Sequence, residues 1–233
     1  MMMKPRTVRI GDAEYPRQLR EYPFSPPGVL YVLGKPMPSD EPVIGVAGTR
    51  EPTEYGRELA YRLGMELARA GFVVATGFAV GIDAEAVKGA VSVGGHVVGV
   101  LPYLYEDGGM RQLANNQLLH ELLSSGYDRL TIVSENLVKD VGKVSQWLAM
   151  RNRIIDGLSR AIIIVETKYR QKGWGTAYHV RFGIGAGKPI LIFKPTWTTD
   201  WYVWLGYKEF VDNGAKIVQS IDEVIDYLRQ IRP

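Results

Sequence analysis

The chain has 233 residues, 46% of them hydrophobic, and carries a formal net charge of +3. This length suits one α/β domain with small additions, and the composition excludes a largely disordered chain. The charge is too low for a protein that coats nucleic acid by electrostatics alone, and the absence of cysteine excludes disulfides, zinc–thiolate centres and thiol nucleophiles.

Residues 1–41 are rich in proline and aromatic residues, as in "YPRQLREYPFSPPGVLYVLGK". They predict an irregular N-terminal segment packed on the main domain. The start of the chain, "MMMKPRTVRI", has no apolar stretch of the kind found in signal peptides, and no run in the sequence is apolar for long enough to span a bilayer. We therefore expect a cytoplasmic protein without membrane contact.

Residues 42–233 alternate short β-branched runs with helical patterns and are expected to form the main, Rossmann-like domain. Between the first two runs, Leu59, Leu63 and Leu67 lie at helical spacing and Gly71 is placed to end a helix. The order of elements predicts an α/β fold with a doubly wound, mostly parallel sheet and helices on both faces. The runs are continuously apolar, as in buried parallel strands: "VIGVAG", "FVVATG", "HVVGVLP", "LTIVSE", "AIIIVE" and "PILIF".

The residues that follow these runs are candidates for ligand binding, because open α/β sheets bind ligands beyond the carboxyl ends of their strands. Glycines let a ligand approach backbone N–H groups, and the N-termini of helices favour anions. Each glycine alone is equally typical of a tight turn, and "KYRQK" alone is typical of a solvated loop. Together they predict a phosphate site at this edge, formed by Gly48, Thr49, Arg50, Gly77, Gly81, Lys168, Arg170 and Lys172.

The stretch "MRNRIIDGLSR" is expected on the later part of a single helix, directly before the run "AIIIVE". Residues two apart do not share a helix face, so at most one of Arg151 and Arg153 is expected to reach a ligand held by Arg50. The other arginine is expected to form a structural ion pair, for which Asp156 and Glu166 are the candidate partners.

Aromatic residues and histidines give weaker signals. Trp174, in the glycine-rich loop "KGWGT", is a candidate for stacking on a base. The three histidines have no spacing typical of a metal site, and no Ser/His/Asp order suggests a catalytic triad, so we predict neither a metal nor a catalytic residue. The segment "LIFKPTWTTDWYVWLGY" is rich enough in aromatic residues to be a candidate dimer surface, although a well-covered core is the simpler explanation.

These motifs, in this order, resemble the DNA-processing protein A family, also called Smf or DprA, over roughly residues 13–230. The resemblance is carried by "GVAGTREPTEYG", "ATGFAVGIDAEA", "VSEN", "RNRIIDGLSRAIIIVE", "GTAYHV" and "NGAKIVQSIDEVIDYL". It implies an extended Rossmann fold, binding of single-stranded DNA, a homodimer and, as in many bacterial members, a RecA-type recombinase as partner. The expected protein is a binder that uses no cofactor and catalyses no reaction.

The resemblance also implies roles for particular residues. Arg50 matches the arginine of the family's Gly-Ser/Thr-Arg motif and would hold a DNA phosphate with the backbone around Gly48 and Thr49. Residues 151–153 match the family's Arg-Asn-Arg and residues 81–83 its Gly-Ile-Asp, both at the pocket. The expected DNA-binding set is Gly48, Thr49, Arg50, Gly77, Gly81, Asp83, Arg151, Asn152, Arg153, Lys168, Arg170, Lys172, Trp174, Gly175 and Thr176.

Three positions depart from the family pattern. Val87 stands where the family has a histidine, Ala149 where a proline precedes the Arg-Asn-Arg motif, and Gln171-Lys172 where Ser-Gly precedes the threonine. These departures predict a divergent member whose finer pocket chemistry differs from that of its relatives.

Two other functions fit a phosphate pocket on this fold. Phosphoribohydrolases that resemble lysine decarboxylases carry the signature Pro-Gly-Gly-x-Gly-Thr-x-x-Glu, which "QKGWGTAYH" echoes with His179 at the position of the catalytic glutamate. The second of these functions is that of a regulatory sensor that binds a free nucleotide or another small phosphorylated ligand. A dinucleotide cofactor is less well supported, because "FVVATG" ends without the acidic residue that would hold a ribose.

Overall fold

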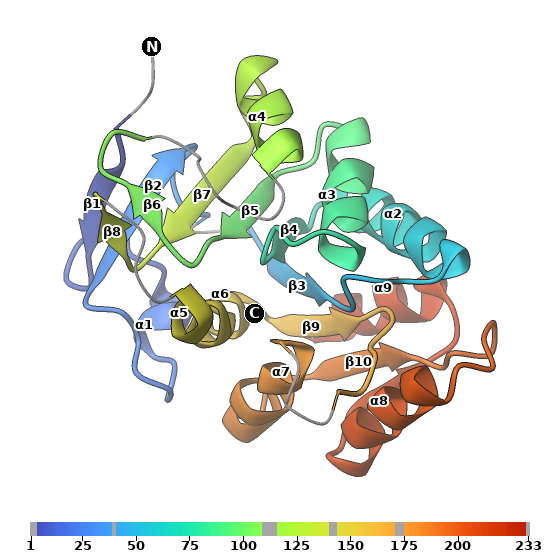
Figure 1. Ribbon diagram of the computed structural model, residues 1–233. Helices are drawn as coiled ribbons and strands as arrows, with labels where there is room; N and C mark the ends of the chain where they lie inside the picture. The colour runs from blue at the N-terminus through green and yellow to red at the C-terminus, as the bar shows by residue number, and fades with distance from the viewer. Residues whose placement is uncertain (1–3, 39–40, 109–115, 140–143, 171–174, 232–233) are drawn as a thin grey trace.

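The computed structural model describes residues 4–38, 41–108, 116–139, 144–170 and 175–231 (Figure 1). Within these ranges the centre is a nine-stranded sheet in the order β1-β2-β7-β5-β4-β3-β9-β10-β11, with a separate pair of short strands, β6 and β8. The strands are β1 (Arg6–Arg9), β2 (Val29–Gly34), β3 (Val43–Ala47), β4 (Val73–Thr76), β5 (Val97–Val100), β6 (Leu104–Tyr105), β7 (Leu130–Ser134), β8 (Leu137–Val138), β9 (Ala161–Ile164), β10 (Ile190–Phe193) and β11 (Lys216–Val218).

Helices cover both faces of this sheet, which confirms the predicted doubly wound fold. The first set, packed in one apolar cluster, is α2 (Glu54–Arg69), α3 (Ile82–Ser92), α4 (Asn116–Ser124) and α9 (Ile221–Gln230). The second set lies in two clusters on the opposite face and consists of α1 (Arg17–Arg20), α6 (Asn152–Leu158), α7 (Tyr178–Phe182) and α8 (Trp201–Asp212). Helix α5 (Val144–Met150) precedes α6, and two short 3-10 turns, η1 (Gly175–Ala177) and η2 (Ile184–Ala186), flank α7.

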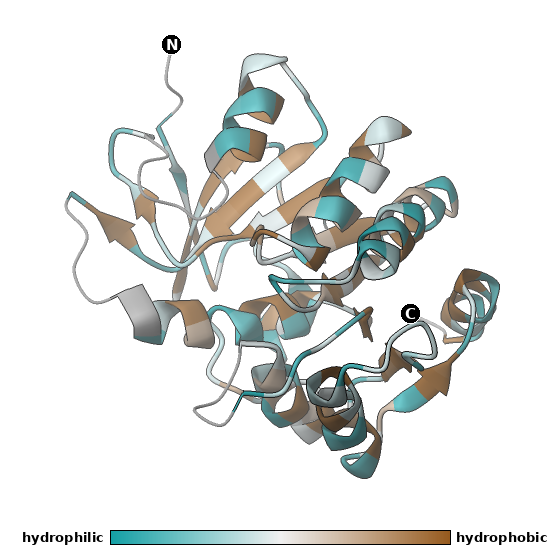
Figure 2. Ribbon diagram, turned by 45° about the vertical axis from the view of Figure 1, so that its right-hand side comes forward, coloured by the Kyte–Doolittle hydropathy of each residue, from teal (hydrophilic) through white to brown (hydrophobic). Residues whose placement is uncertain are grey.

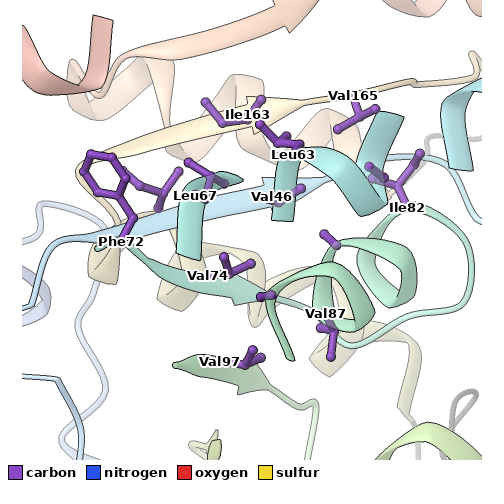
Figure 3. Packing of buried hydrophobic residues seen from close by; sticks show 14 of the residues in the cluster. Val46, Leu63, Leu67, Phe72, Val74, Ile82, Val87, Val97, Ile163 and Val165 are labelled. Carbon is purple, nitrogen blue, oxygen red and sulfur yellow. The ribbon is translucent and has the colours of Figure 1, made fainter. Parts of the chain in front are cut away.

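The continuously apolar runs follow from this burial on both faces. Every residue of β3 is buried. Its Val46 points into the cluster that contains Leu63 and Leu67 of α2 and Ile163 of β9 (Figure 3), whereas Val43 belongs to the cluster on the other face. Figure 2 shows the same pattern as hydrophobic central strands and helices with one hydrophilic side. In the described ranges no helix has the length and apolar character needed to cross a bilayer.

The N-terminal segment is not irregular, contrary to the expectation for residues 1–41. β1 pairs with β2, and β2 pairs with β7, both antiparallel, so this segment extends the main sheet (Figure 1). The expected packing on the core is present, through Tyr15, Leu19 and Leu30 among others. The prolines of this segment lie in the connections and not in β1 or β2. The proline-rich composition of the whole segment therefore gave no indication of the two strands. The central sheet from β7 to β11 is parallel.

Candidate functional site

A cavity of about 460 Å³ lies at the carboxyl ends of β3 and β9. Its walls come from the loops that follow these two neighbouring strands and from α6 and α7, which Figure 1 shows beside them. Ten of the fifteen predicted binding residues line it: Gly48, Thr49, Arg50, Asp83, Arg151, Asn152, Lys168, Arg170, Gly175 and Thr176. The convergence of strand ends at one edge therefore brings distant motifs together, as predicted.

Arg50 is held at the mouth of this cavity by a tightly fixed turn. The Thr49 N–H donates to the carbonyl of Glu166 at 2.7 Å, and the Thr49 carbonyl accepts from Ile82 N–H at 3.2 Å. Gly48 is required there, because a Cβ would lie 2.5 Å from Ile82 Cγ1 and 2.6 Å from the Glu166 carbonyl. Arg50 itself is exposed, and its guanidinium has no hydrogen bond or ion pair with any residue that the structure describes.

Arg151 provides a buried positive charge on the cavity wall. Its Nη1 donates to the Val100 carbonyl at 2.7 Å, and its Nε is buried without a described partner. Burial lowers the pKa of Arg151 to about 10, with Arg50 acting in the same direction and Asp83 opposing it, so the group stays charged at neutral pH. A Cβ at Gly77 would overlap Nη1. Gly77 therefore makes room for Arg151 and does not line the cavity.

Asp83 lies beside Arg151 at the start of α3. The carboxyl group is fully buried, and burial raises its pKa, while Arg151 and the N–H of Ala79 act to lower it. Gly81 precedes this turn with a φ of +86° and packs against the backbone of Arg50, so it supports the turn and does not line the cavity. Asp83 and Arg151 thus place opposite charges on the cavity lining, each influencing the pKa of the other.

The helix N-termini at this edge are occupied by the protein's own carboxylates, contrary to the expectation that they attract a ligand anion. Glu166 Oε1 accepts from Thr53 N–H at 2.9 Å, and Oε2 accepts from the Thr53 hydroxyl at 2.6 Å and from the Trp197 indole at 3.0 Å. Thr53 is the N-cap residue of α2, and its hydroxyl oxygen accepts from Gly56 N–H. Asp83 occupies the first turn of α3, and Asp200 caps α8 by accepting from Tyr202 N–H. Ligand anions here depend on side-chain cations.

Arg153 is a structural residue that does not line the cavity. Its Nη1 and Nη2 donate to the two carboxylate oxygens of Glu135 at 2.7 and 2.6 Å. The expected ion pair exists, but its partner is neither Asp156 nor Glu166. The expected helix is present with a one-residue interruption: α5 ends at Met150 and α6 begins at Asn152, while Arg151 keeps helical φ and ψ, donates to the Trp147 carbonyl and accepts from Ile155 N–H. Residues two apart lie on different sides of a helix, so Arg151 and Arg153 reach different surroundings, as expected.

Lys168 and Arg170 complete the cationic wall with partners that a ligand can replace. Lys168 Nζ lies 2.8 Å from Asp200 Oδ2, and the hydrogen bond between them raises the pKa of Lys168. Arg170 Nη2 lies 3.2 Å from Glu51 Oε1, in a pair more than half exposed. Exposed pairs of this kind contribute about 0–1 kcal/mol, so a phosphate competes with them readily.

Asn152 and Thr176 tie the cavity loops to one another. Asn152 Nδ2 donates to the Gly175 carbonyl at 2.7 Å, and the Thr176 hydroxyl donates to the Gly48 carbonyl at 3.3 Å. Both polar side chains therefore fix loop positions. Lys172 and Trp174 belong to residues 171–174, which lie outside the described part of the chain.

His179 and Asp156 form a buried pair at the cavity that was not predicted from the sequence. His179 Nδ1 lies 2.5 Å from Asp156 Oδ1, both side chains are buried, and His179 lines the cavity. Burial raises the pKa of Asp156, and His179 opposes this shift. Because His179 lies three residues after Thr176, the sequence places it near the cavity. Its pairing with Asp156 of α6 depends on the tertiary fold and has no local signal in the sequence.

Comparison with known proteins agrees with this architecture. The family model described as DNA recombination-mediator protein A matches residues 6–229. The chain is 30% identical over 228 residues to DNA processing protein DprA of Bacillus subtilis, covering 95% of this chain and 71% of that protein. Across six bacterial relatives with DprA or Smf names, it spans 50–71% of their length.

Two solved structures share the fold at 23% identity. DNA processing protein A of Streptococcus pneumoniae aligns with a TM-score of 0.81 over all of this chain and 76% of its own. DNA processing protein A of Helicobacter pylori, whose structure concerns a single-stranded DNA binding mode, aligns with a TM-score of 0.77 over 98% of this chain and 99% of its own. Because the family model spans residues 6–229, nearly the whole chain, this chain belongs to the DNA recombination-mediator protein A family.

Proposed function

We propose that this protein binds single-stranded DNA and holds one of its phosphates with Arg50 in the cavity. The observation that carries the proposal is the state of Arg50: its guanidinium is exposed, unpaired among the described residues and next to the buried charge of Arg151. Family membership supports DNA as the ligand, as does the single-stranded DNA binding of the H. pylori relative.

The charge balance of the cavity supports a phosphate ligand. Among the described residues, four cationic side chains line it, those of Arg50, Arg151, Lys168 and Arg170, against one carboxyl group, that of Asp83. Arg50 and Arg151 repel each other, and a phosphate between them relieves this repulsion. A guanidinium also offers two parallel N–H donors that match two phosphate oxygens.

The cellular context follows from the family. We infer a cytoplasmic protein that acts on DNA without catalysis, forms a homodimer and passes its strand to a RecA-type recombinase. No cofactor is part of this proposal. Light scattering at high protein concentration tests the homodimer, and pull-down with a purified recombinase tests the partner.

One observation favours a second function, hydrolysis of nucleoside monophosphates. His179, at the position of the glutamate in the phosphoribohydrolase signature, lines the cavity and is oriented by Asp156. A histidine that contacts a carboxylate through Nδ1 can act as a base through Nε2. This function requires that purified protein releases free base from a nucleoside monophosphate and that His179→Ala abolishes the release. We expect no release.

The test of the main proposal is anisotropy with labelled oligonucleotides of graded length, single-stranded and duplex, over a range of salt concentrations. We expect affinity to increase with length, to be higher for the single strand, and to fall linearly with salt on logarithmic axes. Equal affinity for mononucleotide and oligonucleotide would contradict a DNA function and favour the nucleotide hydrolase or a nucleotide sensor.

A further inference from the structure

Most of the exposed large apolar residues of the described chain lie close to cavity residues in the sequence or through a contact. This holds for five of the six, and the sixth lies on the edge strand β11. Scattered single apolar residues are ordinary on a protein surface, but a cluster that borders a charged cavity indicates a binding surface. The five are Tyr55, Val80, Met150, Trp201 and Tyr202, and the sixth is Ile217.

Trp201 and Tyr202 are anchored to the cavity wall by backbone and ionic contacts. They begin α8, and Asp200, the residue that caps this helix, pairs with the cavity residue Lys168 at 2.8 Å. The Tyr202 carbonyl accepts from Tyr169 N–H at 2.9 Å. Yet the Trp201 and Tyr202 residues are 68% and 54% exposed. Their rings are thus held beside the cations without being buried by the fold.

Tyr55 adds a third exposed ring on the other side of the same edge. It lies in the first turn of α2, five residues after Arg50, and is 52% exposed. One side of its ring faces Trp197, with ring centroids 4.9 Å apart and planes at 31°. The Trp197 indole in turn donates to buried Glu166. The ring of Tyr55 is therefore supported from within the fold.

The position of α8 is fixed closely against the sheet. Gly206 lies so near Thr167 that a Cβ would be 3.0 Å from the Thr167 carbonyl oxygen and Cγ2. Thr167 directly precedes Lys168 at the exit of β9. A surface that is rigid before binding loses little conformational entropy when a ligand is ordered on it.

We propose that Tyr55, Trp201 and Tyr202, here called the aromatic flank, form a stacking surface for the bases of a single strand whose phosphate lies in the cavity. This inference rests on the proposed function. A base is joined to its phosphate through one sugar, so an apolar aromatic surface beside a phosphate pocket matches a single strand. A duplex keeps its bases paired inside and cannot use it.

The surrounding charges favour nucleic acid over a second copy of the chain, so Trp201 and Tyr202 are here assigned to DNA and not to the dimer surface expected from their aromatic-rich segment. In a twofold homodimer the same patch lies on both subunits, so docking through the aromatic flank would bring two sets of Lys168, Arg170 and Arg50 near one another. Like charges across an interface oppose association. A single strand presents negative charge and apolar bases together, which matches both features of the surface.

The experiment measures binding of two labelled oligonucleotides with the same number of phosphates, one of thymidines and one abasic. Wild type should bind the thymidine strand more tightly than the abasic strand. Trp201→Ala combined with Tyr202→Ala should weaken thymidine binding by roughly 5- to 100-fold and abasic binding by little. Trp201→Phe, which keeps an aromatic ring, should lose less affinity for the thymidine strand than Trp201→Ala does. Ile217→Ala, which removes an exposed apolar side chain on β11, is the matched control and should bind both strands as wild type does.

Each other outcome overturns the proposal. If the double variant binds thymidine strands as wild type does, the aromatic flank does not contact bases. If it loses thymidine and abasic binding equally, the rings support the phosphate pocket instead. If light scattering shows that wild type is a dimer and the double variant is not, the rings belong to a subunit interface. Arg50→Ala distinguishes failure of the proposed function itself, since wild type and Arg50→Ala would then bind both strands equally weakly.

Discussion

Gly77 lies directly against the guanidinium of Arg151, at a distance that leaves no space for a Cβ. The position of the Arg151 guanidinium in the cavity wall thus depends on a glycine that follows β4 and does not itself line the cavity. This relationship gives a function to a glycine that, judged from the sequence, is as typical of a tight turn as of a binding site.

Gly77→Ala should therefore displace Arg151 from the cavity wall. We expect a loss of stability of roughly 1–3 kcal/mol from overpacking, together with weakened DNA binding. Urea unfolding and oligonucleotide anisotropy measure the two effects. Gly28→Ala is the control, because nothing lies within 4 Å of a Cβ there. Unchanged stability in Gly77→Ala would show that Arg151 has another position available.

Arg50→Ala should weaken binding of single-stranded DNA by roughly 1–3 kcal/mol, because it removes a charge-assisted contact. Stability should change little, since the side chain is exposed and unpaired among the described residues. Arg50→Lys should restore only part of the affinity, because lysine lacks the planar pair of donors. Arg57→Ala, also exposed and close in sequence, serves as the control. Equal effects of Arg50→Ala and Arg57→Ala would point to general charge rather than a pocket.

Arg153→Ala should act on stability instead. Glu135 would remain as an unpaired and mostly buried carboxylate, so we expect a loss of about 3 kcal/mol in the free energy of unfolding. Arg153→Met together with Glu135→Leu should recover much of it, because no charge is left unpaired. If the folded double variant loses DNA affinity as strongly as Arg50→Ala does, Arg153 contacts the ligand after all.

Acidification should destabilise the protein through His96. Its Nδ1 lies 2.9 Å from Glu41 Oε2 and its Nε2 lies 2.9 Å from Thr131 Oγ1, but burial lowers the pKa of His96 from its ordinary value of 6.5. As the pH falls below about 6.5, His96 therefore becomes protonated in the unfolded chain while it stays neutral in the folded protein, and this difference favours unfolding. This stability contribution is complete above that pH and is lost as the pH falls toward the folded pKa, by at most about 1.4 kcal/mol per pH unit.

Urea unfolding of wild type and His96→Gln at pH 7.5 and 5.5 checks this expectation. Glutamine keeps a donor and an acceptor but does not titrate in this range. The variant should lose less stability between the two pH values than wild type does. The same loss in both proteins would assign the pH effect to other groups.

The sequence was sufficient where local pattern and fold class determine position. Continuous apolar runs identified the central parallel strands, and the rule that parallel strands present their carboxyl ends at one edge brought Arg50 and Arg151 to one cavity despite the hundred residues between them. The N-terminal strands were missed, because they lie between proline-rich connections.

The rest of the site depends on tertiary contacts that no local pattern contains. Glu166 reaches Thr53, the N-cap residue of α2, across 113 residues, and Arg153 pairs with Glu135, which follows β7. The pairing of His179 with Asp156 likewise requires α6 and α7 to pack together. Such contacts decide whether a polar residue serves the ligand or the fold.

The internal carboxylates that occupy the starts of α2, α3 and α8 also bear on how the cavity releases its ligand. In a pocket built from backbone N–H groups, the donors are fixed, and an anion that leaves them exposes unsatisfied groups. Here carboxylates of the protein already lie at those helix starts, and the outer cations have carboxylates beside them: Lys168 pairs with Asp200 and Arg170 with Glu51. If the cavity holds a DNA phosphate as proposed, release of that phosphate therefore leaves Lys168 and Arg170 with carboxylate partners rather than with unpaired charges.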